Sequence, residues 1–216
     1  MTSDSYRKTL HRLVQIIVPL LLVSGVALLI LPERLFPSFY DVRYMGFAGL
    51  VYAALILGLP ALIRVKSSAP RAHEKNRAAD LTQLGLLITF IGNAAGDLGL
   101  YQLYRYGFEF DKLVHFLTPL IAATLLPIIL RQRFHIRWQA AFMYSFILII
   151  LLGIAWELFE FGADKIFQTR IYGINGSDIN NDTRFDLTLD IIGSLCGILI
   201  AMIFRRKNEN TDTATI

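Results

Sequence analysis

Three short stretches of this chain contain acidic side chains next to long apolar runs, and one of them also contains a histidine. They are DKLVHF at 111–116, WELFE at 156–160 and DLTLD at 186–190. Residues four apart lie on one face of a helix, so Asp111 and His115 would be neighbours about one turn apart. An imidazole gathered with several carboxylates can bind a divalent cation or act in acid and base catalysis.

We predict a site built from one imidazole and four carboxylates. The candidate catalytic residues are His115, Glu157, Glu160, Asp186 and Asp190. Three of them, one from each stretch, are the candidate metal ligands: His115, Glu157 and Asp190. Nearby polar residues are predicted to support the site: Asn93, Asp97, Asp111 and Asp182.

Two chemistries fit these residue types, and the sequence leaves both open. Mixed oxygen and nitrogen ligands suit a divalent cation, namely Mn, Mg, Fe or Zn. Alternatively, the site works without a metal. Burial and like-charge repulsion would then keep one carboxyl group protonated while another stays ionised, as acid and base catalysis requires.

Structural explanations compete with these roles. A histidine at a helix end is often only hydrogen-bonded, and acids in a first helical turn complement the helix dipole. With Asn181 or Asp182 as the N-cap, the dipole explains Asp182 and part of Asp186. It does not explain Asp190, which lies a full turn deeper in an apolar helix, or Glu157, which directly follows LLGIAW.

The composition indicates a membrane protein. The chain has 216 residues, of which 55% are hydrophobic and 18% charged, and its mean hydropathy is +0.51. The net charge of +4 comes from short basic clusters beside apolar runs, which is typical of membrane topology and argues against nucleic-acid binding. The single cysteine excludes a disulfide within the chain.

Six apolar runs are long enough to span a bilayer. We therefore predict an all-α polytopic membrane protein with a short N-terminus at 1–12, a six-helix domain at 13–204 and a tail at 205–216 that is polar and disordered from Asn208. The predicted spans are 13–31, 44–63, 81–104, 113–130, 138–161 and 187–204. Two longer connections are expected between them, a basic solvated one at 65–79 and a turn-rich one at 165–185.

The distribution of Lys and Arg predicts the orientation. Basic residues are concentrated in the N-terminus, the second and fourth connections and the tail, whereas acids mix with fewer bases in the other three connections. By the positive-inside rule, both termini are cytoplasmic. The ionisable residues in the third to sixth runs then all lie within about two turns, or roughly 10 Å, of the outer boundary.

Glycines recur at helical spacing beside the polar clusters. Gly193 and Gly197 follow Asp190, and Gly92 and Gly96 flank Asn93. Such small-residue stripes allow another helix to approach closely. The packing that they permit could also bring the acidic clusters together.

The order DKLVHF, WELFE and NDTRFDLTLDIIG resembles the YjdF family (DUF2238) of uncharacterised bacterial inner membrane proteins. More distantly, the pattern is similar to VanZ-like proteins, with Glu157 at the glutamate position and Asp186, Asp190, Gly193 and Gly197 at the final spacing. Asp190 and Glu160 depart from that pattern, where Asn and Gln occur. The resemblance implies a multi-pass protein of the bacterial inner membrane, within a wider group suggested to act on lipid head groups.

Three functions compete at this point. The first is hydrolysis or group transfer on a substrate with a polar head and an apolar tail, such as a lipid-linked molecule, with membrane lipids as partners. The second is a cation- or proton-coupled transporter, for which a polar path toward the inner side is missing from the sequence. The third is a non-catalytic scaffold whose polar cluster locks helix packing. The sequence does not indicate an oligomeric state.

Overall fold

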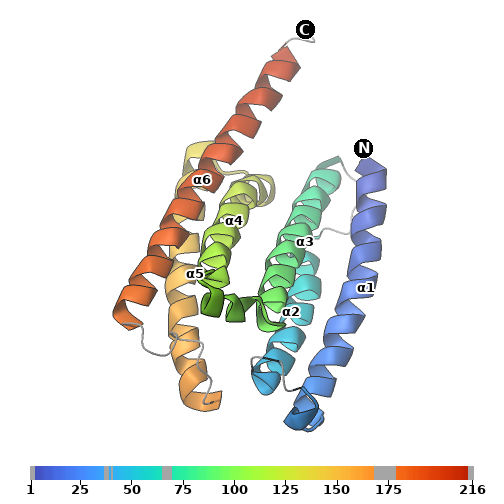
Figure 1. The fold of residues 1–216 in the computed structure, drawn as a ribbon. Helices are drawn as coiled ribbons and strands as arrows, with labels where there is room; N and C mark the ends of the chain where they lie inside the picture. Colours follow the sequence, from blue (N-terminus) through green and yellow to red (C-terminus); the bar gives the residue numbers. More distant parts are fainter. Residues whose placement is uncertain (1–2, 37–38, 40, 65–69, 168–178, 214–216) are drawn as a thin grey trace. The chain divides into compact units, whose positions relative to one another are not determined.

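The chain folds into helices, as a computed structural model shows (Figure 1). The structure describes residues 3–36, 39, 41–64, 70–167 and 179–213, and these ranges contain no strand. The prediction of an all-α protein is confirmed. The elements are α1 (Ser3–Ile30), η1 (Glu33–Leu35), α2 (Val42–Ile63), α3 (Pro70–Asp97), η2 (Leu100–Tyr106), α4 (Phe110–Phe134), α5 (Trp138–Phe167) and α6 (Ile179–Thr213).

The helices have the length and hydropathy of membrane spans, which agrees with a polytopic membrane protein. Among the described residues, five helices qualify alone, and there are six if α3 and η2 together form one bent span. The two parts of that pair are bent by 53°.

The bend falls inside the third predicted span, 81–104, which is not one continuous helix. Helix α3 ends at Asp97, and Gly99 takes a φ of 136° before η2 begins. This backbone conformation is accessible to glycine and strained for residues with a Cβ. The glycine therefore interrupts a run that hydropathy alone joins together.

Several helices extend beyond their predicted ends. Because α3 begins at Pro70, most of the predicted loop 65–79 is helical. Helices α5 and α6 likewise extend into 165–185, and the remaining residues, 168–178, lie outside the described part. Since α6 begins at Ile179, Asn181 and Asp182 lie within the helix and neither is its N-cap. The predicted disorder after Asn208 is also wrong up to Thr213, where α6 ends.

The chain divides into two compact units. Unit 1 comprises Met1–Val114 and Ala163–Thr169, and unit 2 comprises His115–Gly162 and Arg170–Ile216. Two of the three boundaries fall within continuous helices, one in α4 and one in α5, and the third lies outside the described residues.

In unit 1, α1 and α2 approach closely at a pair of glycines. A Cβ built on Gly25 would lie 2.9 Å from the carbonyl oxygen of Gly46, and a Cβ on Gly46 would lie 2.9 Å from that of Gly25. The α3 helix adds Leu87 to the buried core and stacks Phe90 on Tyr52 of α2, with ring centroids 4.2 Å apart. Apolar packing and glycine contacts therefore hold these three helices together.

A buried carboxylate near the start of α3 joins the same three helices. Asp80 accepts a hydrogen bond of 2.7 Å from Arg7 Nε of α1 and one of 3.3 Å from Arg64 Nη2 at the end of α2. Arg64 also donates to Gln83 Oε1, and Gln83 Nε2 donates to the carbonyl of Ile56. This network was not predicted from the sequence, because Asp80 stands just outside the predicted third span.

In unit 2, glycines of α6 seat that helix against α4. A Cβ on Gly193 would collide with the carbonyl oxygen of Phe116, and one on Gly197 would collide with that of Leu120. These predicted packing glycines therefore do allow a close helix approach. A buried apolar cluster lies beside the contact and contains Ala123, Phe142, Ile149, Ile198 and Ala201.

The Asp80 network predicts a specific loss of stability. We expect Asp80→Asn to lower the free energy of unfolding by about 1–3 kcal/mol, because it removes the charge that two guanidinium groups share. The measurement is reversible unfolding in detergent, followed by circular dichroism.

The matched control is Glu33→Gln, which removes an ion pair with Arg43. The side chain of Glu33 is 61% exposed. Exposed pairs contribute little, so we expect a change of less than about 0.5 kcal/mol. Equal destabilisation by both substitutions would contradict a structural role for the Asp80 network.

Candidate functional site

His115 lies in the second turn of α4 and is buried, with an exposed fraction of 6%. The helix begins at Phe110 and carries Asp111 in its first turn, where a negative charge complements the helix dipole. The sequence thus places the imidazole near one end of an apolar helix, on the side that packs against its neighbours.

Two carboxylates from other helices lie next to this imidazole. His115 Nδ1 is 3.2 Å from Asp190 Oδ1 of α6, which is a hydrogen-bonding distance. His115 Nε2 is 3.9 Å from Glu157 Oε1 of α5. All three residues belong to unit 2 and are buried, so the structure brings the three predicted metal ligands together within this unit.

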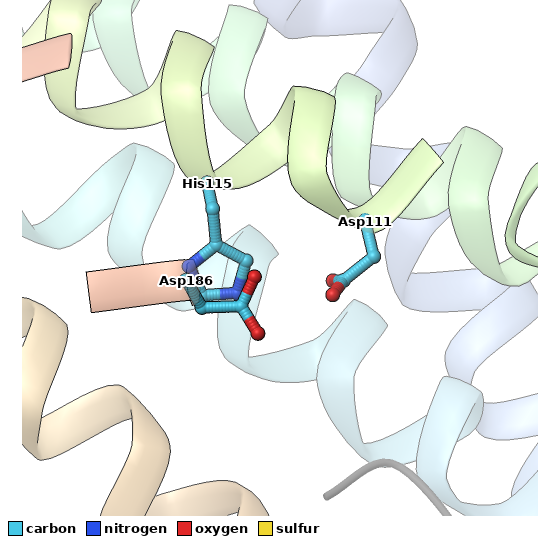
Figure 2. A group of neighbouring side chains, drawn as sticks. All are labelled: Asp111, His115 and Asp186. Carbon is cyan, nitrogen blue, oxygen red and sulfur yellow. The ribbon is translucent and has the colours of Figure 1, made fainter. Parts of the chain in front are cut away.

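A third carboxylate of unit 2, from Asp186, lies one turn before Asp190 on α6 and is also buried. One ligand atom from each of His115, Asp186 and Asp111 lies within 4.8 Å of the others, and Figure 2 shows these side chains around a common point. Asp111 precedes the unit boundary, but α4 is continuous there and fixes its spacing from His115. The group has the ligand types and spacing of a small cation site.

Glu160 has a hydrogen bond within its own helix. Its Oε1 accepts a bond of 2.7 Å from Trp156 Nε1, one turn earlier on α5. The carboxylate is buried, so the indole compensates part of the cost of removing it from water. This contact gives Glu160 a structural explanation that the sequence analysis did not identify.

The remaining predicted residues divide between the units. Asn93 and Asp97 are buried in unit 1, where Asn93 accepts a hydrogen bond of 3.1 Å from Tyr101 and donates one to the carbonyl of Thr89. Their support of the His115 site stays a prediction. Asp182 lies on α6 in unit 2, in the first turn of the helix and half-buried.

Room for the Asp190 carboxylate depends on a glycine that the sequence analysis missed. A Cβ on Gly153 of α5 would collide with Asp190 Oδ2. On α6 itself, the hydroxyl of Ser194 donates a hydrogen bond of 2.6 Å to the backbone carbonyl of Asp190. The signal for Gly153 was its position one turn before Glu157, since a small residue there lets a polar group from another helix approach.

The contacts of His115 restrict its chemistry. The tautomer of the ring decides which atom donates at the contact with Asp190, and an ionised Asp190 carboxylate would accept a proton held by Nδ1. The 3.9 Å between Nε2 and Glu157 Oε1 is too long for a hydrogen bond. A carboxylate on the other ring nitrogen is the usual partner of a metal-binding histidine.

Comparison with known proteins gives a family and one curated relative. A family model described as predicted membrane protein (DUF2238) matches residues 12–207. A Thermotoga maritima protein described as uncharacterized is 29% identical over 106 residues, which is 48% of this chain and 52% of that protein. The matched region thus spans about half the length of the relative. No solved structure matches this chain.

The fit between Gly153 and Asp190 gives a prediction. We expect Gly153→Ala to displace the Asp190 carboxylate and to lower the free energy of unfolding by about 1–2 kcal/mol, because the new methyl group overpacks the contact. Unfolding in detergent measures the effect.

Gly162→Ala on the same helix is the control, since no described atom lies within 4 Å of the position that its Cβ would take. Alanine is the better helix former, so this change should be neutral or stabilise by up to about 1 kcal/mol. Similar effects of the two substitutions would show that Gly153 does not make room for Asp190.

Proposed function

This chain belongs to the DUF2238 family of predicted membrane proteins, and we propose that it is a membrane-embedded hydrolase or transferase. Its substrate is a lipid-linked molecule, and the reaction takes place at the polar head group. The observation that carries this proposal is the buried imidazole of His115, held between Asp190 and Glu157 of two other helices.

Charge balance supports a reactive site. Glu157, Asp186 and Asp190 are each less than 9% exposed, among apolar helices. Ionised carboxylates gathered out of water are stable only if they share protons or a positive charge. Buried carboxylates that share protons or a positive charge are typical of sites for acid, base and metal chemistry.

A divalent cation fits the donor set. We assign His115, Asp186 and Asp111 as its ligands, because one ligand atom from each lies within 4.8 Å of the others; Glu157, which the sequence predicted as a ligand, serves instead as a base. Asp190 then holds the imidazole through Nδ1 and is a positioning residue, which modifies the sequence-based assignment of Asp190 as a ligand. When bound, the cation would act as a Lewis acid on the head group.

The protein's own residues would supply the proton transfers. Glu157, whose Oε1 is 3.9 Å from His115 Nε2, would take the proton from a water or hydroxyl group that attacks beside the imidazole. The hydrogen bond to Asp190 fixes the ring orientation, so His115 loses little entropy when it engages a reacting group. Burial strengthens each of these interactions because it excludes bulk water.

The surroundings favour a substrate with an apolar tail. Exposed apolar side chains lie beside each of the three central residues in the sequence, namely Leu113 and Leu117, Leu158 and Phe159, and Ile191 and Ile192. These side chains present hydrocarbon to the lipid phase on the same helices that carry the polar groups. A lipid tail can therefore remain in the bilayer while its head group reaches the site.

Metal content tests the cation without relying on activity. After equilibration with Mn²⁺ or Zn²⁺, we expect about one ion per chain by elemental analysis. Asp190→Asn should weaken binding roughly 10- to 100-fold, as the loss of an outer partner of a metal ligand does. His115→Ala should abolish stoichiometric binding, whereas His11→Ala, which changes an exposed histidine of α1, should not. An equal metal content in all variants would contradict the assignment.

Turnover tests the reaction itself. The substrates are a bacterial polar lipid extract and a polyprenyl-linked phosphate in mixed micelles, and mass spectrometry detects released water-soluble products. We expect His115→Ala and Glu157→Gln to reduce the rate at least roughly 100-fold, with His11→Ala unchanged. Unchanged rates would reject catalysis at His115. Proton or cation flux in sealed vesicles that depends on these residues would instead favour transport.

A further inference from the structure

We propose that Arg131, Trp138 and Arg205 of unit 2 form a second site, which binds the phosphate of an anionic lipid head group. The three residues come from the end of α4, the start of α5 and the last part of α6. Arg131 lies 16 residues beyond His115 on one helix, which is roughly 24 Å at 1.5 Å per residue. The site is therefore distinct from the histidine and carboxylate site.

The indole of Trp138 is the fixed part of this site. It stacks on Phe142, one turn later on α5, with ring centroids 5.6 Å apart. It also packs against the buried apolar cluster of unit 2, and its exposure is intermediate. A tryptophan anchored on one side and partly exposed on the other is typical of the boundary between hydrocarbon and head groups.

Two guanidinium groups from different helices lie over this one side chain. The Cζ atoms of Arg131 and Arg205 are 5.0 Å and 5.6 Å from the ring centroid, both within cation–π range. Arg131 Nη1 also donates a hydrogen bond of 3.3 Å to the carbonyl of Ile136, which holds the side chain toward the start of α5. The contacts therefore hold two positive charges at one indole ring.

The sequence around the pair is basic and contains no acid. No Asp or Glu occurs between Asp111 and Glu157 or between Asp190 and Glu209. Four further bases lie near the pair in the sequence: Arg133, Arg137, Arg206 and Lys207. Such a concentration of positive charge at a lipid boundary attracts anionic head groups.

Helix capping alone does not account for the arrangement. Arg131 and Arg133 lie in the last turn of α4, where they complement the helix dipole. Arg205 comes from another helix and shares the Trp138 ring with Arg131, so a dipole effect on α4 does not explain its position. A phosphate can accept bonds from two guanidinium forks at once, so an anionic head group at this ring would interact with both charges.

The chain has two tryptophans, so Trp156→Phe leaves Trp138 as the only indole reporter. This protein is reconstituted into phosphatidylcholine vesicles that contain brominated phosphatidylglycerol or brominated phosphatidylcholine, and quenching of Trp138 fluorescence is measured. We expect the anionic lipid to bind roughly tenfold more strongly than the zwitterionic one, since each nearby base contributes severalfold. Arg131→Gln with Arg205→Gln should reduce this preference to about one- to twofold.

Arg133→Gln with Arg137→Gln is the matched control, because it removes the same net charge and leaves both guanidinium groups at Trp138. It should keep most of the preference. If added inorganic phosphate leaves the preference intact, the ligand is the lipid head group. If it removes the preference, the site binds phosphate from solution.

Two results would overturn the proposal: equal quenching by both lipids in the protein with intact arginines, or equal losses in the two double variants. Should the first double variant fail to fold, Arg131→Lys with Arg205→Lys replaces it. That change keeps the charge but removes the planar fork, so the preference should fall severalfold. An unchanged preference would then reject the site.

Discussion

Unit 2 depends on a polar contact buried between apolar helices, the 3.2 Å approach of His115 Nδ1 to Asp190 Oδ1. Out of water, each group would be costly alone, and together they satisfy one another. The contact requires α4 and α6 to pack closely, which Gly193 and Gly197 permit, and it requires space on α5, which Gly153 leaves. Small residues and buried polar groups are therefore parts of one arrangement, because the polar contact needs the close helix approach that the glycines permit.

The bilayer explains why this arrangement is concentrated near one end of the helices. Long apolar faces of α1, α5 and α6 remain exposed, as lipid-facing helices require. Polar groups must then lie between helices or near their ends. The His115 site, the Asp80 network and the arginines at Trp138 all follow this rule, yet they differ in charge and contacts. The carboxylate-rich site suits a cation or protons, and the arginine pair suits an anion.

Much of the fold and part of the site follow from sequence. Hydropathy located the apolar helices, and four-residue spacing placed Asp186 and Asp190 on one face of α6. Hydropathy could not locate the break at Gly99, because that break depends on a backbone dihedral angle within an apolar run. It also could not reveal that Gly153 faces Asp190, since a contact between helices far apart in sequence leaves no periodic signal. The sequence predicted Glu160 as part of the site because it shows the charge of this residue. The hydrogen bond from Trp156 to Glu160 becomes known only from the structure.

The most direct test of the central claim is the protonation of His115, measured by nitrogen NMR on protein with labelled histidine in lipid. The chain has four histidines, so the difference between the native protein and His115→Gln isolates this signal. We predict that Nδ1 carries the proton and that Asp190→Asn shifts the signal. Asp182→Asn, which changes a carboxylate eight residues earlier on α6, should leave the signal unchanged. A His115 spectrum that is the same in both variants would contradict a bond between α4 and α6 and, with it, the proposed site.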